Sequence, residues 1–279
     1  MAGPSQSDEL ILTDPTTQAT VAIAPARGGL VTRFDLAGRQ VLYLDDATLR
    51  DPSKNVRGGV PVLFPSPGKL AGDAWQRGDR RGAMKQHGFA RNLPWQSRRV
   101  DAATATLELR ATDETRAQYP WDFTIEQTIA LRGRSLRLEQ RVSNHGDTPM
   151  PFGFGFHPYF FVRDADKAAT AVTTDATRAF DNVAKHDVAL TGPIDLTRAE
   201  VDLQLLDHGA PRSALASPAG TVQLAGSPDY RHWVVWTLAG KDFVCVEPWT
   251  CPGNALNTGD RLIHLAPGEQ RAMWIEITA

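Results

Sequence analysis

Apolar and polar residues alternate along much of this chain, and the alternation constrains its fold more than any other feature. In residues 123–131 every odd position is apolar except Gln127, and the pattern resumes after residues 132–134 with Leu136 and Leu138. Two such runs around a short glycine-containing connection predict a β-hairpin. Similar short runs occur at residues 41–44, 106–109, 201–205, 221–224, 233–236 and 273–277. We therefore expect many short strands.

Helical periodicity is nearly absent from the sequence. The best helical candidate is the short segment 113–118, which Pro120 would end. The 23 glycines and 19 prolines suit a chain of strands and turns. These features predict an all-β fold with two or more packed antiparallel sheets. Because we find no internal repeat and no clear linker, residues 1–279 are expected to form a single domain.

Composition and charge argue against several classes of protein. The formal net charge is −2, so we expect neither nucleic acid nor a membrane as a partner. The first residues lack the basic segment and apolar run of a signal peptide, and no apolar stretch is long enough to span a bilayer. Cys245 and Cys251 are too few for a disulfide framework. A cytoplasmic protein with reduced thiols is expected.

One carboxylate near the C-terminus interrupts an otherwise apolar strand. In residues 243–247, alternation places Val244 and Val246 on one face and Glu247 on the other. A carboxylate among apolar side chains costs free energy unless it is paired or used. Pro248 is expected to end the strand, and strand ends beneath loops commonly display catalytic groups. A structural and a catalytic carboxylate fit this stretch equally well.

A histidine follows a stripe of phenylalanines in the middle of the chain. If residues 152–161 are extended, the phenylalanines at even positions share one face, while Gly153, Gly155 and His157 lie on the other. Glycines on that face would leave room for a ligand to approach the backbone beside the histidine. A lone histidine among aromatic residues is more often structural, but the two glycines favour a pocket.

A cluster of hydrogen-bond donors follows the long polar segment 65–86, and loops of that length are often functional. Gln86, His87 and Arg91 suit the recognition of hydroxyl groups or an anion. The alternative is a loop that hydrogen-bonds to itself. Upstream, Arg57 precedes a Gly-Gly turn and a short apolar strand, and alone it would be taken for a surface or ion-pairing residue.

Four motifs together resemble one enzyme family. They are RGGVPVLFP (57–65), QHGFARNLPW (86–95), GFHPYF (155–160) and VCVEPWTCPGNALNTG (244–259). Their order and spacing are similar to those of aldose 1-epimerases (mutarotases) and the related hexose-6-phosphate epimerases. The resemblance extends from about residue 22 to the C-terminus. It implies an isomerase with a large antiparallel β-sandwich of the galactose mutarotase type and a sugar cleft on its concave face.

The resemblance gives Glu247 the role of general base and His157 that of general acid. Interconverting α and β anomers requires opening the sugar ring, rotating about C1–C2 and closing on the other face. A base removes the anomeric hydroxyl proton while an acid protonates the ring oxygen, and each transfer typically contributes about 10²–10⁴-fold. This needs an ionised Glu247 and a protonated His157, which their opposite charges favour and burial opposes. A bell-shaped rate–pH profile is expected.

The resemblance also implies a set of binding residues. His87 and Arg91 match the substrate-binding pair, and Arg57 and Gln86 match positions that line the pocket in the phosphate-type members. Asp202 matches an acidic sugar-binding segment, although a leucine follows it where the family usually has arginine. An aspartate on the polar face of an ordinary strand is the alternative for this residue.

The substrate can be argued in two ways. Arg57, Arg91 and the basic residues of segment 65–86 (Arg77, Arg80, Arg81 and Lys85) could hold a phosphate. The HPYF motif and the long EPWTCPGNALNTG segment are more similar to the free-aldose members. We predict an aldose 1-epimerase acting on an unphosphorylated sugar. The alternatives are a hexose-6-phosphate 1-epimerase and, from another class, a non-catalytic carbohydrate-binding protein.

No cofactor is expected for such a reaction. The seven histidines show no close ligand spacing, and the two cysteines do not form a CxxC pair, so no metal is expected either. The expected partner is a small-molecule sugar. A site built within one chain requires no second subunit, so a monomer or weak oligomer is expected.

Overall fold

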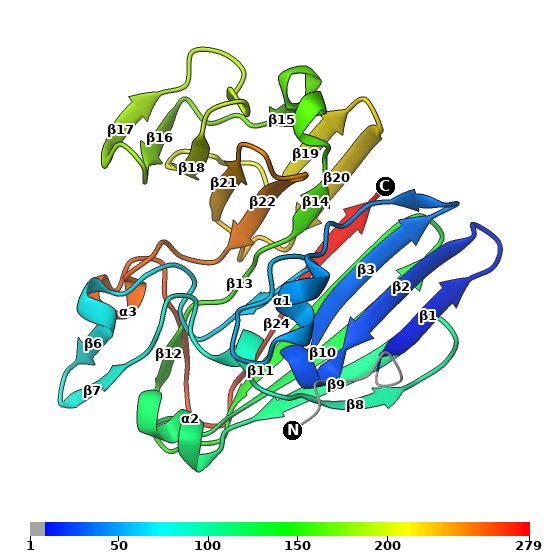
Figure 1. Ribbon diagram of the computed structural model, residues 1–279. Helices are drawn as coiled ribbons and strands as arrows, with labels where there is room; N and C mark the ends of the chain where they lie inside the picture. The colour runs from blue at the N-terminus through cyan, green and yellow to red at the C-terminus, as the bar shows by residue number, and fades with distance from the viewer. Residues whose placement is uncertain (1–8) are drawn as a thin grey trace.

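The computed structural model describes residues 9–279, and antiparallel β-sheet makes up most of the regular structure (Figure 1). One eight-stranded sheet has the order β15-β19-β20-β24-β11-β10-β9-β8. Its strands are β8 (Gln96–Arg99), β9 (Thr104–Arg110), β10 (Phe123–Arg132), β11 (Ser135–Asn144), β15 (Ala171–Thr173), β19 (Arg212–Ser217), β20 (Gly220–Gly226) and β24 (Gln270–Thr278). The predicted all-β class is confirmed.

A second eight-stranded sheet carries the candidate site. Its order is β17-β16-β18-β21-β22-β13-β5, and β14 also pairs with β22. Its strands are β5 (Val62–Leu63), β13 (Gly155–Phe156), β14 (Tyr159–Phe161), β16 (Arg178–Asp181), β17 (His186–Ala189), β18 (Glu200–Leu205), β21 (His232–Leu238) and β22 (Phe243–Trp249).

Smaller elements complete the structure. A four-stranded sheet comprises β1 (Leu10–Asp14), β2 (Ala19–Ala24), β3 (Leu30–Leu36) and β4 (Arg39–Gln40), and the two-stranded pairs are β6 (Ala74–Arg77) with β7 (Arg80–Ala83) and β12 (Met150–Phe152) with β23 (Ile263–Leu265). The helices are α1 (Asp46–Arg50), α2 (Asp113–Gln118) and α3 (Ala255–Thr258), with 3-10 turns η2 (Pro25–Arg27), η3 (Ala71–Asp73), η4 (Ala90–Asn92) and η5 (Asp164–Ala169). Within residues 9–279 no helix is long and apolar enough to cross a membrane.

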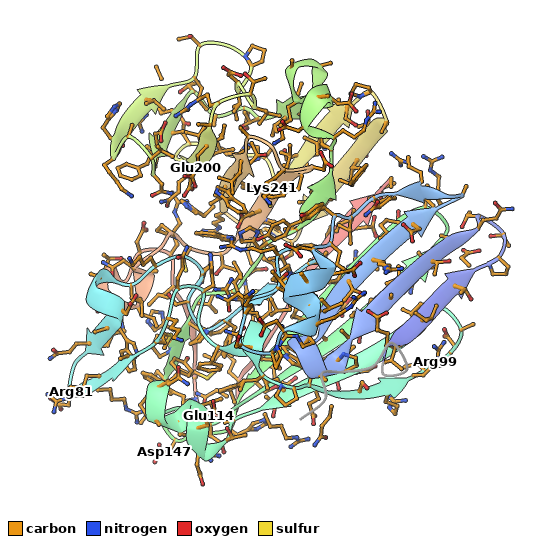
Figure 2. The ribbon with its side chains drawn as sticks, viewed as in Figure 1. Arg81, Arg99, Glu114, Asp147, Glu200 and Lys241 are labelled. Carbon is orange, nitrogen blue, oxygen red and sulfur yellow. The ribbon has the colours of Figure 1, made fainter. Side chains whose placement is uncertain are left out.

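The hairpin predicted from the alternating pattern is formed by β10 and β11. Ile125 lies opposite Val142 and Ile129 opposite Leu138. All four side chains are fully buried in the main hydrophobic core, where burying each contributes about 1.5–3 kcal/mol. Charged side chains such as Glu114 extend from the periphery (Figure 2). Strand alternation thus separates core from solvent.

Two local predictions differ from the structure. Residues 41–44 form only isolated bridges, Leu42 with Phe160 and Leu44 with Gly58, because the chain turns at Asp45 to begin α1. Residues 65–86 are not one loop, since they contain η3 and the β6–β7 hairpin. The predicted helix 113–118 is confirmed as α2.

The strand β22 continues through Pro248 to Trp249, so the prediction that Pro248 ends it is wrong. Pro248 lies opposite Trp233 of β21. On its other side β22 pairs with β14 at residues 243–245 and with β13 at Trp249, which leaves Pro248 in the gap between the two ladders. A proline has no N–H to donate, so the gap accommodates it. Trp249 therefore belongs to the same strand as Glu247.

Candidate active site

Alternate residues of neighbouring strands form the floor of a cleft of about 580 Å³. Val234 of β21 lies opposite Glu247 of β22 and also opposite Gln204 of β18. Side chains directly opposite one another in a sheet point to the same face. The floor residues on these three strands are Asp202, Gln204, Val234, Trp236, Glu247 and Trp249.

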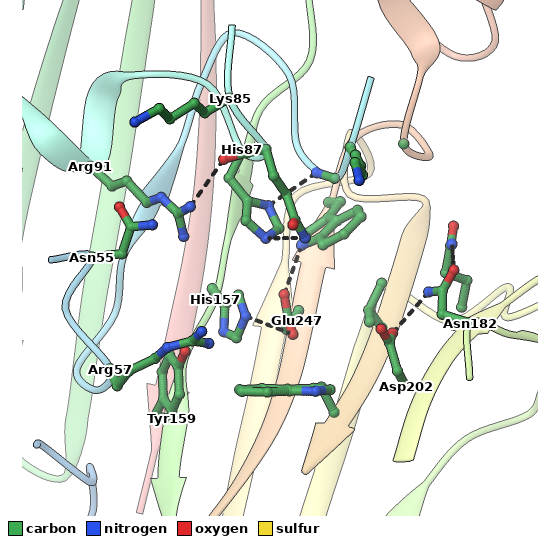
Figure 3. Close-up of a pocket in the computed structure, with 18 of the residues that line it drawn as sticks. Asn55, Arg57, Lys85, His87, Arg91, His157, Tyr159, Asn182, Asp202 and Glu247 are labelled. Atoms are coloured by element: carbon green, nitrogen blue, oxygen red, sulfur yellow. Dashed lines mark hydrogen bonds and ion pairs between the residues drawn. The ribbon is translucent and has the colours of Figure 1, made fainter. Parts of the chain in front are cut away.

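The register of β22 brings His157 to Glu247. In the two ladders that flank this point, Tyr159 lies opposite residue 245 and Gly155 opposite Trp249. Both ladders share one register, which places His157 directly across from Glu247. His157 Nε2 lies 3.3 Å from Glu247 Oε1 (Figure 3). The structure thus joins the two residues predicted to form the acid–base pair.

Burial dominates the electrostatics of this pair, whose side chains are 9% and 2% exposed. Burial raises the pKa of Glu247 well above its usual value, and the Asp202 carboxylate adds to the increase. Burial and the Arg91 guanidinium lower the pKa of His157 to about 3. Burial therefore outweighs the mutual attraction of the two charges, and the pair consists of a protonated Glu247 beside a neutral His157. The two groups share one proton in this state.

His87 lies close to the catalytic candidates, and its ring is held in a defined orientation. The backbone N–H of Gly68 donates to His87 Nδ1 at 3.1 Å, which assigns the ring proton to Nε2. The His87 ring packs edge-on against His157, with centroids 5.6 Å apart. Burial, followed by the nearby Arg91, lowers the pKa of His87 well below its usual value. A neutral His87 therefore carries its proton on Nε2, which lies 3.2 Å from the side-chain amide nitrogen of Gln86, so the two side chains present one polar group to the cleft.

Two arginines occupy one end of the cleft (Figure 3). Arg91 Nη2 donates to the Gln86 carbonyl at 3.0 Å, while its buried Nε has no hydrogen-bond partner among residues 9–279. Burial lowers the pKa of Arg91 to about 10, so it stays charged at neutral pH. The Arg57 guanidinium lies over the Trp236 ring, 5.5 Å from its centroid.

The cleft contains more cationic than anionic side chains. The cationic residues lining it are Arg57, Lys69, Lys85, Arg91 and Lys185, and the anionic ones are Glu200, Asp202 and Glu247. None of the five cations forms a salt bridge with another residue of the described part of the chain. Their charges therefore remain available to an anionic ligand.

Most of the basic loop predicted as a phosphate site points elsewhere. Arg80 lies over the Trp121 ring at 4.8 Å and donates to the Pro120 carbonyl. Arg77 donates to the Leu256 carbonyl at 3.4 Å. Of the basic residues predicted in this loop, Lys85 lines the cleft. The β6–β7 hairpin carries the arginines away from it.

Asp202 belongs to a directed chain of side-chain hydrogen bonds. His232 Nε2 lies 3.0 Å from Gln204 Oε1, and Gln204 Nε2 donates to Asn182 Oδ1 at 3.1 Å. Asn182 Nδ2 then donates to Asp202 Oδ1 at 2.8 Å. One carboxylate oxygen is thereby fixed, and Asp202 faces the cleft. This placement favours a ligand-binding aspartate over an ordinary strand residue.

The glycines beside His157 do not leave room for a ligand, contrary to the prediction. A Cβ at Gly155 would come within 2.7 Å of Trp249 Cδ1, and a Cβ at Gly153 within 2.4 Å of Cys251 Sγ. The space is occupied by residues that follow Glu247. The glycines therefore allow β22 and the segment after it to pack closely against β13.

Cys245 lies beside the acid–base pair, two residues before Glu247 on the same face of β22. Its thiol and the side-chain ligand atoms of His157 and Glu247 lie within 4.8 Å of one another, so this group could in principle hold a metal ion. Burial raises the pKa of the Cys245 thiol well above its usual value, so in the metal-free protein this thiol is protonated.

All seven predicted site residues line this one cleft: Arg57, Gln86, His87, Arg91, His157, Asp202 and Glu247. Sequence reasoning did not assign several others that line it, among them Asn55, Lys69, Asn182, Lys185, Gln204, Trp236 and Trp249. The period-two pattern could have indicated Trp249, because it lies two residues after Glu247 on β22, whereas Trp236 lies on β21, which contributes no predicted site residue. No sequence signal marks Asn182 and Lys185, which follow β16.

Comparison with known proteins agrees with this architecture. The aldose 1-epimerase family profile matches residues 10–278. The crystal structure of a protein from Synechocystis sp. PCC 6803 is 36% identical in sequence and superposes with a TM-score of 0.93. The match includes 100% of this chain and 99% of the Synechocystis chain. A galactose mutarotase-like protein from Lactobacillus casei shares the fold with a TM-score of 0.77 and 20% identity, covering 97% of this chain and 99% of its own.

The fold and the cleft define a galactose mutarotase-like β-protein. The chain belongs to the aldose 1-epimerase family, and it is a carbohydrate epimerase of the isomerase class. An Escherichia coli K12 relative named "Putative glucose-6-phosphate 1-epimerase" is 31% identical over 288 residues, which cover 93% of this chain and 88% of the relative. A relative from Cenchrus ciliaris with the same name is 26% identical over 313 residues, 96% of this chain and 86% of the relative.

Proposed function

We propose that this protein is an aldose 1-epimerase in which Glu247 and His157 exchange protons with the anomeric centre of the sugar. One observation carries the proposal: the two side chains face each other across a strand pair at 3.3 Å, buried at the floor of a polar cleft. The anomeric hydroxyl and the ring oxygen are bonded to the same carbon, so two adjacent groups can reach both. The pair is placed for a coupled transfer.

The proton balance closes over one reaction cycle. Ionised Glu247 takes the proton of the C1 hydroxyl while protonated His157 gives a proton to the ring oxygen, and the C1–O5 bond breaks to form the open aldehyde. After rotation about C1–C2, neutral His157 takes the proton back from O5. Glu247 then returns its proton to the carbonyl oxygen as the ring closes. No proton is gained or lost overall.

The buried environment suits the middle of this cycle. With the ring open, Glu247 is protonated and His157 is neutral, which is the state that burial favours. The starting ion pair holds the same single proton in another place. Because the pKa of Glu247 is raised and that of His157 is lowered, the one-proton form persists over a wide pH range. We therefore expect the bell-shaped rate–pH profile to have a broad plateau.

The remaining cleft residues are proposed to hold the sugar. Asp202 would accept hydrogen bonds from hydroxyl groups, and the paired side chains of His87 and Gln86 would offer further hydrogen-bonding groups. Arg91 and Gln86 line the same end of the cleft, where Arg57 is also positioned to donate. Fixed polar groups of this kind orient the anomeric carbon over the acid–base pair.

A phosphorylated aldose is the second candidate substrate, beside the unphosphorylated aldose predicted from sequence. The five unpaired cations of the cleft favour it, because they could neutralise a phosphate through charge-assisted hydrogen bonds. The names of the Escherichia coli and Cenchrus ciliaris relatives refer to such a substrate.

The experiment compares glucose and glucose 6-phosphate side by side. Each freshly dissolved α anomer is followed by NMR or, for glucose, also by optical rotation, with and without catalytic amounts of protein. Faster equilibration of either anomer supports the epimerase, and the sugar that responds more strongly identifies the substrate class. Binding without acceleration of any aldose tested would instead support a non-catalytic carbohydrate-binding protein.

We further propose that residues 1–279 act as a single domain, working in the cytoplasm as a monomer or weak oligomer. The cleft is built within one chain, and both cysteines are free and buried, as expected in a reducing compartment.

A further inference from the structure

Both oxygens of the Glu247 carboxylate have a defined neighbour. The indole Nε1–H of Trp249 donates to Glu247 Oε2 at 3.2 Å. The other oxygen, Oε1, lies 3.3 Å from His157 Nε2. The chain therefore distinguishes two chemically equivalent oxygens, because one is bonded to a tryptophan and the other faces the acid.

Two glycines make the position of this indole possible. Gly155 lies opposite Trp249 in the sheet, and a Cβ there would come within 2.7 Å of the indole Cδ1. A Cβ at Gly68 would come within 3.1 Å of the indole Cζ3. The His87 and His232 rings flank Trp249, with centroids 5.6 and 5.7 Å away. The indole is thus held from several sides and is only 5% exposed.

We propose that Trp249 is a positioning residue that holds Oε2 of Glu247 and thereby assigns Oε1 to the anomeric proton. This inference rests on the proposed function of Glu247. A fixed N–H toward a carboxylate also stabilises the ionised form, which is the form that takes the proton. Trp249 thus determines which oxygen of Glu247 faces the substrate, and it also affects how readily that carboxylate takes a proton.

Charged neighbours act on Glu247 in both directions. Burial and the Asp202 carboxylate raise its pKa, while the Trp249 N–H and the Arg91 guanidinium lower it. On β21 the residue opposite Glu247 is the apolar Val234. The other titratable groups that face the carboxylate are His157, Tyr159 on β14 and Cys245 on β22 itself. Trp249 is the neutral donor in this set.

Loss of the indole N–H has a defined expected effect. A hydrogen bond to a charged group is worth enough to shift the pKa of Glu247 upward by about one unit or more. Each unit makes the reactive form, with Glu247 ionised and His157 protonated, about tenfold rarer. We therefore expect kcat to fall by about tenfold or more, and the alkaline limb of the rate–pH profile to move up by about one unit.

The test uses Trp249→Phe and an isosteric replacement of Trp249 by benzothienylalanine, in which sulfur replaces the N–H without changing the ring shape. The matched control is Trp121→Phe, because Trp121 is also 5% exposed and donates its N–H to a backbone carbonyl, that of Pro149, at 2.9 Å outside the cleft. Two quantities are measured in each protein: the pKa of the Glu247 carboxyl by NMR titration, and kcat and KM on glucose and glucose 6-phosphate.

The expected result is a raised Glu247 pKa and a lowered kcat in both position-249 variants, with KM of the isostere within about twofold and no change in Trp121→Phe. An unchanged Glu247 pKa and kcat in the isostere would overturn the proposal. So would a raised KM with unchanged kcat, which would make Trp249 a binding surface only. If the unmodified protein accelerates neither sugar, the proposed function fails, while the carboxyl titration still decides the role of Trp249.

Discussion

Two histidine–carboxylate pairs occur in residues 9–279, and they differ in what surrounds them. His157 and Glu247 are both buried, lie 3.3 Å apart and line the cleft. His208 Nδ1 lies closer to its partner, 2.7 Å from Asp175 Oδ1, but the Asp175 side chain is 53% exposed. Neither residue of the second pair is among those lining the cleft. The shorter contact is therefore not the one suited to catalysis.

The hydrogen bonds of the two histidines explain the difference. His208 Nδ1 also lies 2.9 Å from Thr174 Oγ1, and its Nε2 lies 3.2 Å from the Arg212 carbonyl. Both nitrogens of His208 are thus occupied by the protein. Within the described residues His157 Nδ1 has no hydrogen-bond partner, and its Nε2 faces Glu247. A catalytic pair needs a histidine nitrogen that is not already hydrogen-bonded within the protein, and it needs a carboxylate shielded from water. The pair of His208 and Asp175 has neither.

The largest expected effect comes from removing the buried carboxylate. Glu247→Gln keeps the shape and the Trp249 hydrogen bond but abolishes the base, so kcat should fall by about 10²–10⁴-fold. The matched change in the other pair, Asp175→Asn, should leave kcat within about twofold, because that pair lies outside the cleft. Turnover is measured by NMR on the sugar that the unmodified protein accepts. Near-normal kcat in Glu247→Gln would contradict the role of Glu247.

The two members of the proposed catalytic pair, Glu247 and His157, should also behave as one unit. His157→Asn should lower kcat by about 10²–10³-fold, and the double variant with Glu247→Gln should be far less impaired than the product of the two effects. Each transfer depends on the other, so the first loss removes most of the benefit of the second group. A double-mutant cycle of kcat measures this coupling. Strictly multiplicative losses would show that the groups act independently.

A smaller effect is expected for Asp202, which is proposed to bind hydroxyl groups without exchanging protons. Asp202→Asn should raise KM by about tenfold and leave kcat within a few-fold, because one charge-assisted hydrogen bond is weakened. The Asp202 charge raises the pKa of Glu247, so its removal should also move the alkaline limb of the rate–pH profile downward. A hundredfold loss of kcat at unchanged KM would instead give Asp202 a part in proton transfer.

Sequence patterns predicted the fold well because the period of two determines which side chains face the core. The helix 113–118 was predicted to the residue, as Thr112 caps it and Pro120 follows. Strand register could not be predicted in this way. The pairing of His157 with Glu247 depends on the alignment of segments about ninety residues apart. From the residues alone, Glu247 and His157 could each be structural or catalytic. Only the family resemblance indicates that they act as a pair.

The missed residues have physical reasons of their own. Trp249 lies beyond the strand end predicted at Pro248 and is not assigned to the site from sequence, whereas the gap between two ladders tolerates a proline there. Lys185 follows β16 and reaches the cleft only through the tertiary fold. Conversely, Arg80 was a phosphate candidate by composition but packs on Trp121. Charge in a loop does not specify the direction in which the loop projects.

The smallest expected effect concerns the structural pair and has a definite pH dependence. Burial lowers the pKa of His208 in the folded protein, and the Asp175 carboxylate opposes that decrease. A folded-state pKa below the unfolded value means that stability is lost as pH falls from the unfolded pKa toward the folded one. Asp175→Asn should lower the folded-state pKa of His208 further, which widens this range.

Urea denaturation at two pH values measures the effect. At pH near 8, Asp175→Asn should change the free energy of unfolding by less than about 1 kcal/mol, since the aspartate is half exposed and its attraction is screened. At pH near 5 the loss should be larger, because the unfolded chain then binds a proton that the variant's folded His208 binds even less readily. An equal loss at both pH values would show that Asp175 acts through its hydrogen bond to the Gly209 N–H rather than through its charge.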